Sequence, residues 1–304
     1  SDVYKRQALY STIIKKTKMI ISRNKQITFL CTVVACLLSI TSFNTYALGQ
    51  LMVSPTRIVF EGGDRTKQIT LINNGSETGR FRISFVRRNM NQNGKIVAVD
   101  EDEPGKYSDE MIRFSPRQVT LAPGQSQTVR LMLRKKRDTT DGEYRSHMMF
   151  KSLPDPATSD VKTLTSNKNE GLTIELIPVV GITIPVIVRQ GHLNAKVSLG
   201  DFEIKQSNTV KAQPVLSLKI NRHGNMSTYG DFRVYFTPKG GKPVVVGQVN
   251  GVAVYTSTES RILDIKLQTP GEFGLSNGEL HITYLEPGKD EITGLIAESR
   301  LAVP

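Results

Sequence analysis

The sequence predicts an all-β protein made of two sandwich domains. In many short runs apolar residues alternate with polar ones, and a period of two places successive side chains on opposite faces of a strand. Turn signals such as Asn-Gly and Pro-Gly separate these runs. No segment of the N-terminal half shows a sustained helical period. At 304 residues, the chain has room for about two domains.

The beginning of the chain has the pattern of an export signal. Met19 is the first methionine, and residues 1–18 resemble translated upstream or added sequence. After Met19 come two basic residues, an apolar run over residues 27–40 and a small-residue cleavage site ending at Ala47. The apolar run is short for a transmembrane helix. We therefore expect residues 19–47 to be a cleaved signal peptide.

Charge and cysteine content change once this segment is set aside. The full chain has a formal charge of +12, and the part after residue 47 keeps 33 basic and 27 acidic side chains, a charge of +6. Cys31 and Cys36 are the two cysteines of the chain, and both lie in the signal. Residues 33–36 resemble a lipoprotein box, but apolar residues continue beyond Cys36, which favours ordinary cleavage. We expect no disulfide in the exported protein.

Residues 48–190 are predicted to form the first domain, a sandwich of the immunoglobulin-like kind. Seven or eight short strands with turns between them are typical of that fold. Asn93-Gly94 predicts a hairpin, and Asp141-Gly142-Glu143-Tyr144 predicts a tyrosine corner, in which a buried ring needs a partner for its hydroxyl. The expected strands lie at Leu51–Phe60 with a break at Pro55, Ile69–Leu71, Phe81–Phe85, Ile96–Val99, Ile112–Phe114, Val119–Leu121, Val129–Leu133 and Tyr144–Phe150.

The segment from Leu172 to Arg189 has an apolar residue at every even-numbered position. It predicts a strand that could extend ~60 Å at ~3.3 Å per residue, longer than an ordinary strand. Pro178 and Pro185 each remove a backbone donor, which favours an edge strand over a central one. A long apolar edge invites pairing with another chain. Two interpretations remain open: a buried strand that closes the sandwich, or an edge that lends its apolar row to a partner.

Residues 191–304 are predicted to form a second all-β domain. The same alternation and turn signals continue after a short linker at Gln190-Gly191-His192. The expected strands lie at Val197–Leu199, Phe202–Ile204, Val215–Ile220, Phe232–Phe236, Val244–Val246, Val252–Tyr255, Ile262–Leu267 and Leu280–Tyr284.

Several stretches of the first domain, taken together, resemble the periplasmic pilus chaperones of the PapD-like kind. The resemblance covers about residues 51 to 190, whereas the second domain is similar only in size and class. The stretches that resemble the family's first, second, fifth and sixth strands are Ser54–Phe60, Thr70–Asn74, Phe114–Pro116 with Leu121–Arg130, and Lys151–Pro154.

This resemblance implies two immunoglobulin-like sandwiches set at an angle and a function without ATP or any cofactor. In the family, a strand of the chaperone fills the gap in an incomplete pilus subunit, a mode called donor-strand complementation. An outer-membrane usher then exchanges the chaperone for the next subunit. The implied partners are therefore a pilus or fimbrial subunit and an usher, and the implied location is the periplasm. The donor row would be Leu172, Ile174, Leu176, Val180 and Ile182.

The resemblance also implies a basic site that holds the C-terminal carboxylate of the subunit. Arg57 would be its anchor, since a guanidinium can grip a carboxylate through two hydrogen bonds. The alternative is that Arg57 is an ordinary solvent-exposed arginine of a strand, without a binding role. The family's second cation, a lysine, falls on Pro185, and the sequence has no lysine from Leu172 to Arg189. Either another cation replaces it or this chain anchors its client differently.

Other classes of function find little support in the sequence. The four histidines are scattered without metal-ligand spacing. Ser146 and His147 are neighbours in a strand and so point to opposite faces, which argues against a nucleophile pair. The basic run 134–137 lacks interleaved aromatic residues, so we expect no nucleic acid partner, and we expect no small-molecule substrate, metal or enzymatic activity. The alternative function is a structural or adhesive two-domain component of a surface assembly.

Overall fold

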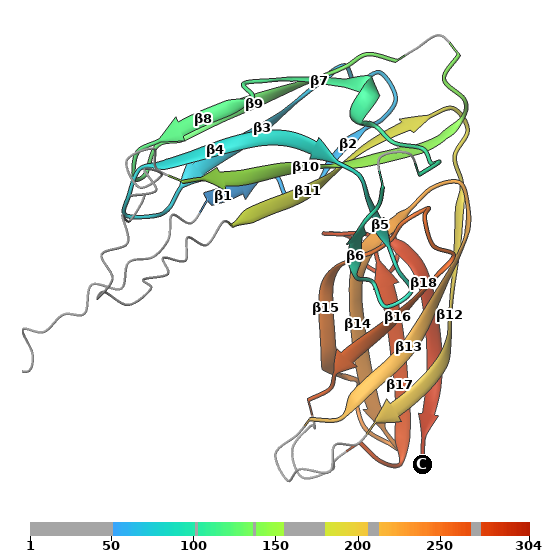
Figure 1. Ribbon diagram of the computed structural model, residues 1–304. Coiled ribbons are helices and arrows are strands. Elements are labelled where there is room, and N and C mark those ends of the chain that lie inside the picture. Colours follow the sequence, from blue (N-terminus) through green and yellow to red (C-terminus); the bar gives the residue numbers. More distant parts are fainter. Residues whose placement is uncertain (1–50, 101–102, 136–137, 155–179, 206–212, 269–274) are drawn as a thin grey trace, which may run out of the picture. The chain divides into compact units, whose positions relative to one another are not determined.

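The computed structural model describes residues 51–100, 103–135, 138–154, 180–205, 213–268 and 275–304 (Figure 1). Within these ranges the chain forms β-strands and one short 3₁₀ helix, η1 (Asp109–Met111). The strands make two sandwiches with separate cores, which confirms the predicted fold class. The boundaries at 48–190 and 191–304 stay predictions. The expected signal peptide lies outside the described residues.

The N-terminal sandwich pairs a four-stranded sheet, β1-β3-β9-β7, with a five-stranded sheet, β2-β11-β10-β4-β8 (Figure 1). A separate hairpin, β5-β6, follows β4 and confirms the turn predicted at Asn93-Gly94. The strand bounds are β1 Leu51–Ser54, β2 Ile58–Phe60, β3 Thr66–Asn73, β4 Gly79–Val86, β5 Arg88–Met90, β6 Ile96–Ala98, β7 Ile112–Ser115, β8 Gln118–Leu121, β9 Ser126–Leu133, β10 Gly142–Leu153 and β11 Gly181–Gln190.

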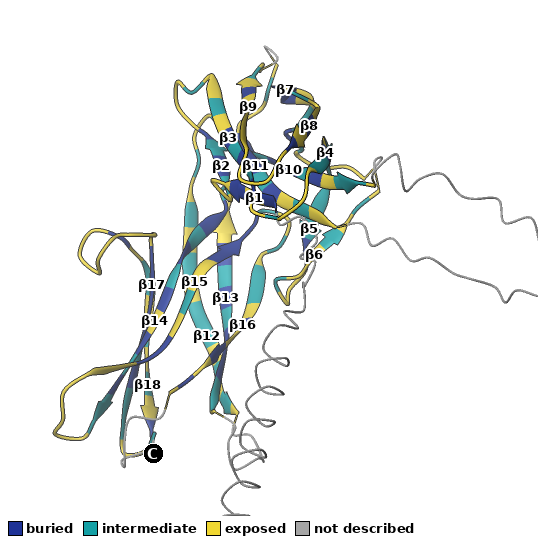
Figure 2. Cartoon of the chain, turned by 90° about the vertical axis from the view of Figure 1, so that its left-hand side faces the viewer, coloured by how far each residue is buried: buried dark blue, intermediate teal, exposed yellow. Residues whose placement is uncertain are grey.

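The core of this sandwich follows the alternation in the sequence. Val129 and Leu131 of β9 are completely buried, and so is Met148 of β10. Figure 2 shows buried and exposed residues succeeding one another along many of the strands. The hydroxyl of Tyr144 donates a hydrogen bond to the carbonyl oxygen of Thr140 at 2.9 Å. This contact is the one expected of a tyrosine corner.

The predicted break near Pro55 separates strands that belong to different sheets. β1 pairs antiparallel with β3 in the four-stranded sheet. β2 crosses to the five-stranded sheet and pairs in parallel with β11, where Val186 lies opposite Ile58 and Val188 opposite Phe60. Proline has no backbone N–H to donate to a ladder, which suits Pro55 to the crossing. The crossing places Arg57 immediately before β2.

The prediction that the strand ending at Arg189 is an edge strand is correct for one half of β11 and wrong for the other. All of β11 pairs with β10, from Gly181 to Gln190. Only residues 186–188 have a second partner, β2, which makes that part central. Within the described residues, 181–185 have no second partner and form a free edge. The apolar alternation predicts a strand, but it does not show that the three-residue strand β2 pairs with residues 186–188.

The second sandwich pairs a three-stranded sheet, β12-β13-β16, with a four-stranded sheet, β15-β14-β17-β18. Its core includes Phe232 and Tyr284, whose rings stack with centroids 4.4 Å apart. The strand bounds are β12 Ala195–Lys205, β13 Val215–Gly224, β14 Thr228–Pro238, β15 Val244–Val254, β16 Ser260–Lys266, β17 Gly278–Leu285 and β18 Leu295–Val303.

The second sandwich departs from the sequence prediction in three places. The strands expected at Val197–Leu199 and Phe202–Ile204 are one strand, β12, with a register shift against β13 between Gly200 and Glu203. The two strands expected around Val244 and Val252 are one strand, β15, which continues through two register shifts against β14. β18 was not predicted at all. It is an edge strand that pairs only with β17, and its residues are mostly exposed or half-buried. Glu298-Ser299-Arg300 interrupts the apolar pattern there, because the outer edge of a sheet buries few side chains.

His147 of β10 lies on the outer face of the five-stranded sheet, opposite to Ser146, as the strand period predicts. It is only 3% exposed, and its ring meets the ring of Tyr255 edge to face, with centroids 6.5 Å apart. Burial and, to a smaller extent, the nearby charges of Arg145 and Arg88 together lower the pKa of His147 to about 3. The folded protein therefore keeps this imidazole neutral at mildly acidic pH.

We predict that acid weakens the fold through His147. The unfolded chain binds a proton on this residue below pH ~6.5, whereas the folded chain does not until pH ~3. The stabilisation is thus complete above pH ~6.5 and is lost progressively as the pH falls toward 3, by about 1.4 kcal/mol per pH unit from this one group. Urea unfolding of the wild type and of His147→Leu from pH 7 to 4 gives the free energy of unfolding at each pH. The slope of this free energy against pH should be smaller in His147→Leu than in the wild type.

The control for this experiment is the exposed His223, replaced by Gln. A slope that is the same in His147→Leu and the wild type would contradict the prediction.

Candidate functional site

The site is built on the outer face of the five-stranded sheet. Ladder pairing places Ile187 of β11 between Val59 of β2 and Arg145 of β10. One row further along the sheet, Pro185 lies opposite His147. Extending the parallel register by one residue beyond Val186 and Ile58 places Arg57 on the other side of Pro185. Arg57 and Arg145 therefore lie on the same face, in neighbouring rows.

Arg57 is half-buried and contacts two aromatic rings. Its guanidinium lies 4.6 Å from the ring centroid of Tyr229 in β14 and 5.7 Å from that of Tyr255, which follows β15. Its Nη1 also donates to the Tyr255 hydroxyl at 3.3 Å. Among the described residues, Arg57 has no carboxylate partner. The two rings therefore hold the guanidinium of Arg57 in position, whereas no neighbouring side chain would hold a freely solvated strand arginine.

Arg145 is more deeply buried, at 5% exposure. Its guanidinium carbon lies 3.9 Å from the centroid of Tyr255. Nη2 donates to the carbonyl oxygen of Arg88 at 3.1 Å and to the hydroxyl of Ser257 at 3.2 Å. Nε and Nη1 are buried without a hydrogen-bond partner among the described residues. Burial lowers the pKa of Arg145 to about 10, so the group remains charged at neutral pH.

An acidic network lies at the other end of this face. The buried carboxylate of Glu143 accepts hydrogen bonds from the backbone N–H and the hydroxyl of Ser227, at 3.1 and 2.7 Å. Arg189 donates to the same Glu143 oxygen at 3.4 Å and to Glu61 at 3.0 Å. Glu143 therefore links β10 to β11 and to Ser227, which lies just before β14. One carboxylate oxygen, Oε2, accepts all of these hydrogen bonds.

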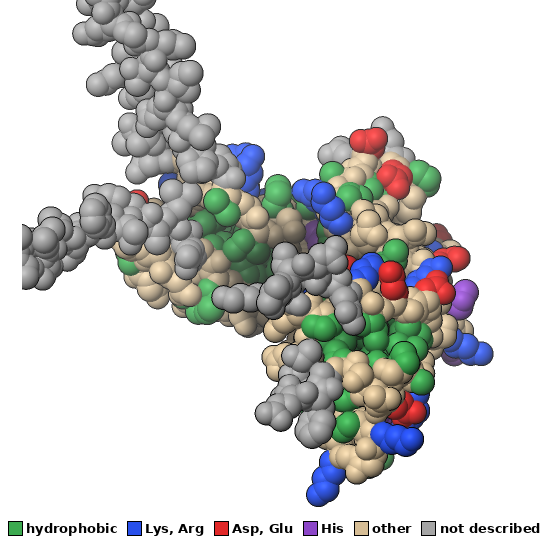
Figure 3. All heavy atoms as spheres, turned by 90° about the horizontal axis from the view of Figure 1, so that it is seen from below, with side chains coloured by type: hydrophobic (Ala, Val, Ile, Leu, Met, Phe, Trp, Pro, Cys, Tyr) green, Lys and Arg blue, Asp and Glu red, His purple; other side chains and the backbone are tan. Residues whose placement is uncertain are grey.

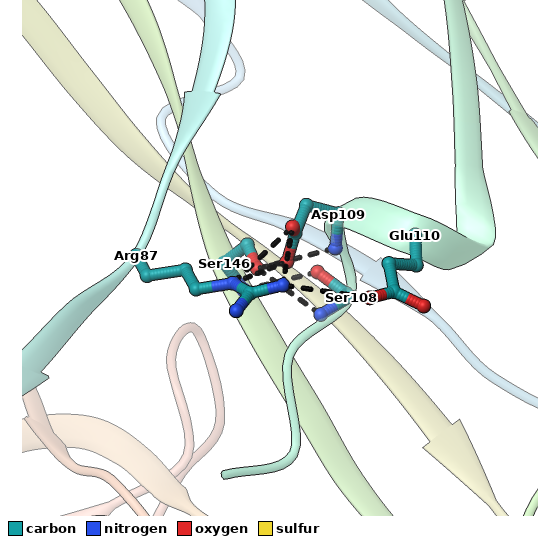
Figure 4. Close-up of polar contacts among 5 residues, drawn as sticks. All are labelled: Arg87, Ser108, Asp109, Glu110 and Ser146. Atoms are coloured by element: carbon teal, nitrogen blue, oxygen red, sulfur yellow. Dashed lines mark hydrogen bonds and ion pairs between the residues drawn. The ribbon is translucent and has the colours of Figure 1, made fainter. Parts of the chain in front are cut away.

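A second network holds β11 from the interior side (Figure 4). Ser108 donates from its hydroxyl to the carbonyl oxygen of Val186 at 2.7 Å and accepts from the N–H of Ser146 at 2.9 Å. Ser146 in turn donates to Asp109 at 2.7 Å, and Arg87 pairs with Asp109 at 3.0 Å. Burial alone would raise the pKa of Asp109, but the contacts with Ser146 and Arg87 outweigh it and lower that pKa. This network fixes β11 at the point where its free edge begins.

The residues predicted for the donor row have different positions. Leu172, Ile174 and Leu176 lie outside the described residues. Val180 is 55% exposed, and its carbonyl oxygen accepts from the N–H of Ser152. Ile182 is half-buried and packs against the core of its own sandwich. The role of these five residues stays a prediction.

Apolar and basic side chains both reach the surface near the free edge. A cavity of ≈ 400 Å³ beside it is lined by Arg88, Ile96, Met149, Lys151, Gly181 and Thr183. In the view of Figure 3, apolar side chains gather in patches with cations near them. Such a surface can accept an extended strand with mixed apolar and acidic side chains.

The sequence identified Arg57 but not the residues around it. Tyr229, Tyr255 and Ser257 come from the second sandwich, where no motif marks them. Arg145 is a basic residue in a strand, one of many in the chain, and only its burial distinguishes it. Within the described residues there is no group of side chains suited to a metal ion, and no helix has the length and apolar character needed to span a bilayer.

Comparisons with known proteins concern this same region. Residues 50–189 match the family model of the PapD N-terminal domain, described as a pili and flagellar-assembly chaperone. No curated protein matches the chain.

Solved structures of fimbrial chaperone systems are similar over most of the chain. A chain from a chaperone–tip adhesin complex of CFA/I fimbriae biogenesis is 16% identical with a TM-score of 0.41, over 84% of this chain and 99% of its own. The Pseudomonas aeruginosa CupB2 chaperone is 11% identical (TM-score 0.38, 83% and 100%). A chain from the Salmonella enterica SafA pilin in complex with the SafB chaperone is 14% identical (0.39, 84% and 98%).

The family model spans all the strands of the N-terminal sandwich, including β11, and it also spans Arg57 and Arg145. The similarity to the PapD-like pilus chaperones thus covers residues 50–189, the N-terminal sandwich.

Proposed function

We propose that this protein is a periplasmic chaperone that binds pilus subunits by donor-strand complementation and delivers them to an outer-membrane usher. The family is one of non-enzymatic periplasmic pilus chaperones. The observation that carries the proposal for this chain is the free edge of β11 at residues 181–185, with an apolar alternating sequence before it and Arg57 beside its end.

The free edge supplies what strand addition needs. Unpaired backbone N–H and C=O groups give a grip that does not depend on the sequence of the partner. Alternate apolar side chains, assigned here to Leu172, Ile174, Leu176, Val180 and Ile182, fill pockets in the subunit. Each buried aliphatic side chain contributes roughly 1.5–3 kcal/mol before ordering costs.

Arg57 supplies a fixed end point for the client. A guanidinium held by two aromatic rings loses little freedom when a carboxylate binds. Among the described residues, the charge of Arg57 has no acidic partner, so a carboxylate can bind there without displacing another carboxylate. A subunit anchored there by its C terminus would then pair along β11 in a defined register.

We predict that Val180→Asp disrupts the complex with the pilus subunit. A charge at this exposed position would have to enter an apolar pocket of the subunit, while the free chaperone would lose little stability. Co-purification of the chaperone with a subunit encoded beside it measures complex formation. The matched control is Val245→Asp, because Val245 of β15 is 54% exposed and Val180 is 55% exposed. Complexes that survive Val180→Asp would argue for a structural or adhesive component instead.

We predict that Arg57→Ala weakens subunit binding roughly ten- to hundredfold, the range expected for the loss of a charged hydrogen bond. Titration of the purified subunit followed by surface plasmon resonance measures it. Arg113→Ala, at an exposed arginine of β7, is the control and should bind as the wild type does. Unchanged affinity in Arg57→Ala, with native circular dichroism, would show that the client is anchored elsewhere.

A further inference from the structure

The outer face of the four-stranded sheet β1-β3-β9-β7 carries cations and no acidic side chain. None of these four strands contains an aspartate or a glutamate. The residues that point outward are mostly serine, threonine and glutamine, and the arginines among them are Arg113 of β7 and Arg130 of β9. A basic face without acidic neighbours produces a field that attracts anions.

Three arginines surround one exposed methionine on this face. Met132 of β9 is 41% exposed, and Arg113 lies directly opposite it in the ladder. Arg130 precedes Met132 by two residues, and Arg134 follows it by two. The backbone N–H of Arg134 donates to the carbonyl oxygen of Met111 at 2.7 Å, so this residue still follows the sheet. The period of two then places all three arginines on the same side as Met132.

The basic patch consists of Arg113, Arg130, Arg134 and Lys135, with Met132 among them. All four cations are exposed. Among the described residues, none of their side chains forms an ion pair or a hydrogen bond. Arg134 and Lys135 begin the basic run of the sequence, and the fold adds one arginine from β7 and one from β9 to it. The patch is therefore open to an anionic partner.

The shape and chemistry of the basic patch favour a membrane surface over a single small anion. A small ligand binds where donors converge in a cavity, whereas these cations are spread along β7 and β9 on an open sheet. Arginine can lay its apolar stem on a surface and keep its charge among the headgroups. The exposed methionine adds an apolar contact at the boundary between headgroups and acyl chains. Clusters of about four or more basic side chains are attracted to anionic lipids.

The basic patch and the free edge of β11 belong to different sheets. β11 lies in the five-stranded sheet, which packs against the four-stranded sheet through the core. The outer faces of two packed sheets point in opposite directions. A membrane on the patch therefore leaves residues 181–185 accessible to a client.

We propose that the basic patch binds the anionic headgroups of a phospholipid bilayer and so holds the protein at a membrane surface. This inference goes beyond the proposed function and does not depend on donor-strand complementation. The contact is mainly electrostatic, so salt weakens it by screening the charges. A patch of this size without a lipid anchor gives reversible association with the surface and no insertion.

The test is sedimentation of the exported chain with vesicles. One set of vesicles contains phosphatidylglycerol and phosphatidylcholine in equal parts, and the other contains only phosphatidylcholine, which has no net charge. We expect the wild type to bind the anionic vesicles and not the neutral ones. It should leave the anionic vesicles in about 1 M salt, where the Debye length is only about 3 Å.

The double variant Arg113→Gln/Arg130→Gln removes two charges from the patch. Each cation near an anionic surface strengthens binding about 5-fold, so partition of this variant onto the anionic vesicles should fall roughly 30-fold. Arg113→Lys/Arg130→Lys keeps the charge and should bind as the wild type does. The matched control is Lys239→Gln/Lys242→Gln, which removes the same charge from two exposed lysines of the second sandwich and should also bind normally.

Three results would overturn the inference. The first is that the wild type binds both kinds of vesicle equally or binds neither. The second is an equal loss in Arg113→Gln/Arg130→Gln and in the lysine control, because net charge would then decide and the patch would not. The third is binding of the wild type to soluble polyglutamate but not to anionic vesicles, which would assign the patch to an acidic protein.

Two further measurements keep the test decisive. If Arg113→Gln/Arg130→Gln does not fold, Arg134→Gln/Lys135→Gln removes the same charge outside the strands and should show the same loss. Co-purification of either double variant with the pilus subunit should equal that of the wild type. Failure of the membrane inference would therefore leave the proposed function standing, and failure of subunit binding would leave this inference standing.

Discussion

The three-residue parallel ladder between β2 and β11 determines the layout of the N-terminal sandwich. It covers β11 only at residues 186–188, and the preceding residues 181–185 keep one side free. The same ladder brings Arg57 to the end of that free edge. A longer β2 would close the edge, and no β2 at all would leave Arg57 without a fixed place. The apolar edge and the basic group therefore come from one pairing.

Charged side chains on the outer face form two groups, one built around a carboxylate and one of arginines against aromatic rings. Glu143, Glu61 and Arg189 form a hydrogen-bonded network with Ser227, in which the second carboxylate oxygen of Glu143 is buried without a partner among the described residues. Arg57 and Arg145 contact aromatic rings in place of carboxylates. Aromatic faces attract cations without consuming their charge. Such rings can hold guanidinium groups in position while leaving them available to an anion.

Much of the fold could be predicted from the sequence because its strands alternate clearly. The break at Pro55, the hairpin at Asn93-Gly94 and the tyrosine corner each have a local chemical cause, and each is present. β18 was missed because an exposed edge strand has little need of apolar residues. The prediction that β11 is an edge strand was correct for residues 181–185 and wrong for residues 186–188. Pairing with a strand that is distant in sequence leaves no local signal in the strand itself.

The candidate site could be predicted only where a family motif marks it. Arg57 lies in such a motif, whereas Tyr255 and Ser257 meet it from the second sandwich across long sequence separations. Arg145 could not be distinguished from other strand arginines, because burial and missing hydrogen-bond partners are properties of the folded chain.

The crossing of the chain between β1 and β2 has a consequence for cooperativity. A single short segment joins the outermost strands of two different sheets, so the sheets cannot separate without breaking one of two ladders. Local opening at residues 181–185, by contrast, leaves both ladders intact. The N-terminal sandwich should therefore contain a low-stability segment within an otherwise cooperative unit. An edge that fluctuates independently of its core can exchange one partner strand for another without unfolding the protein that carries it.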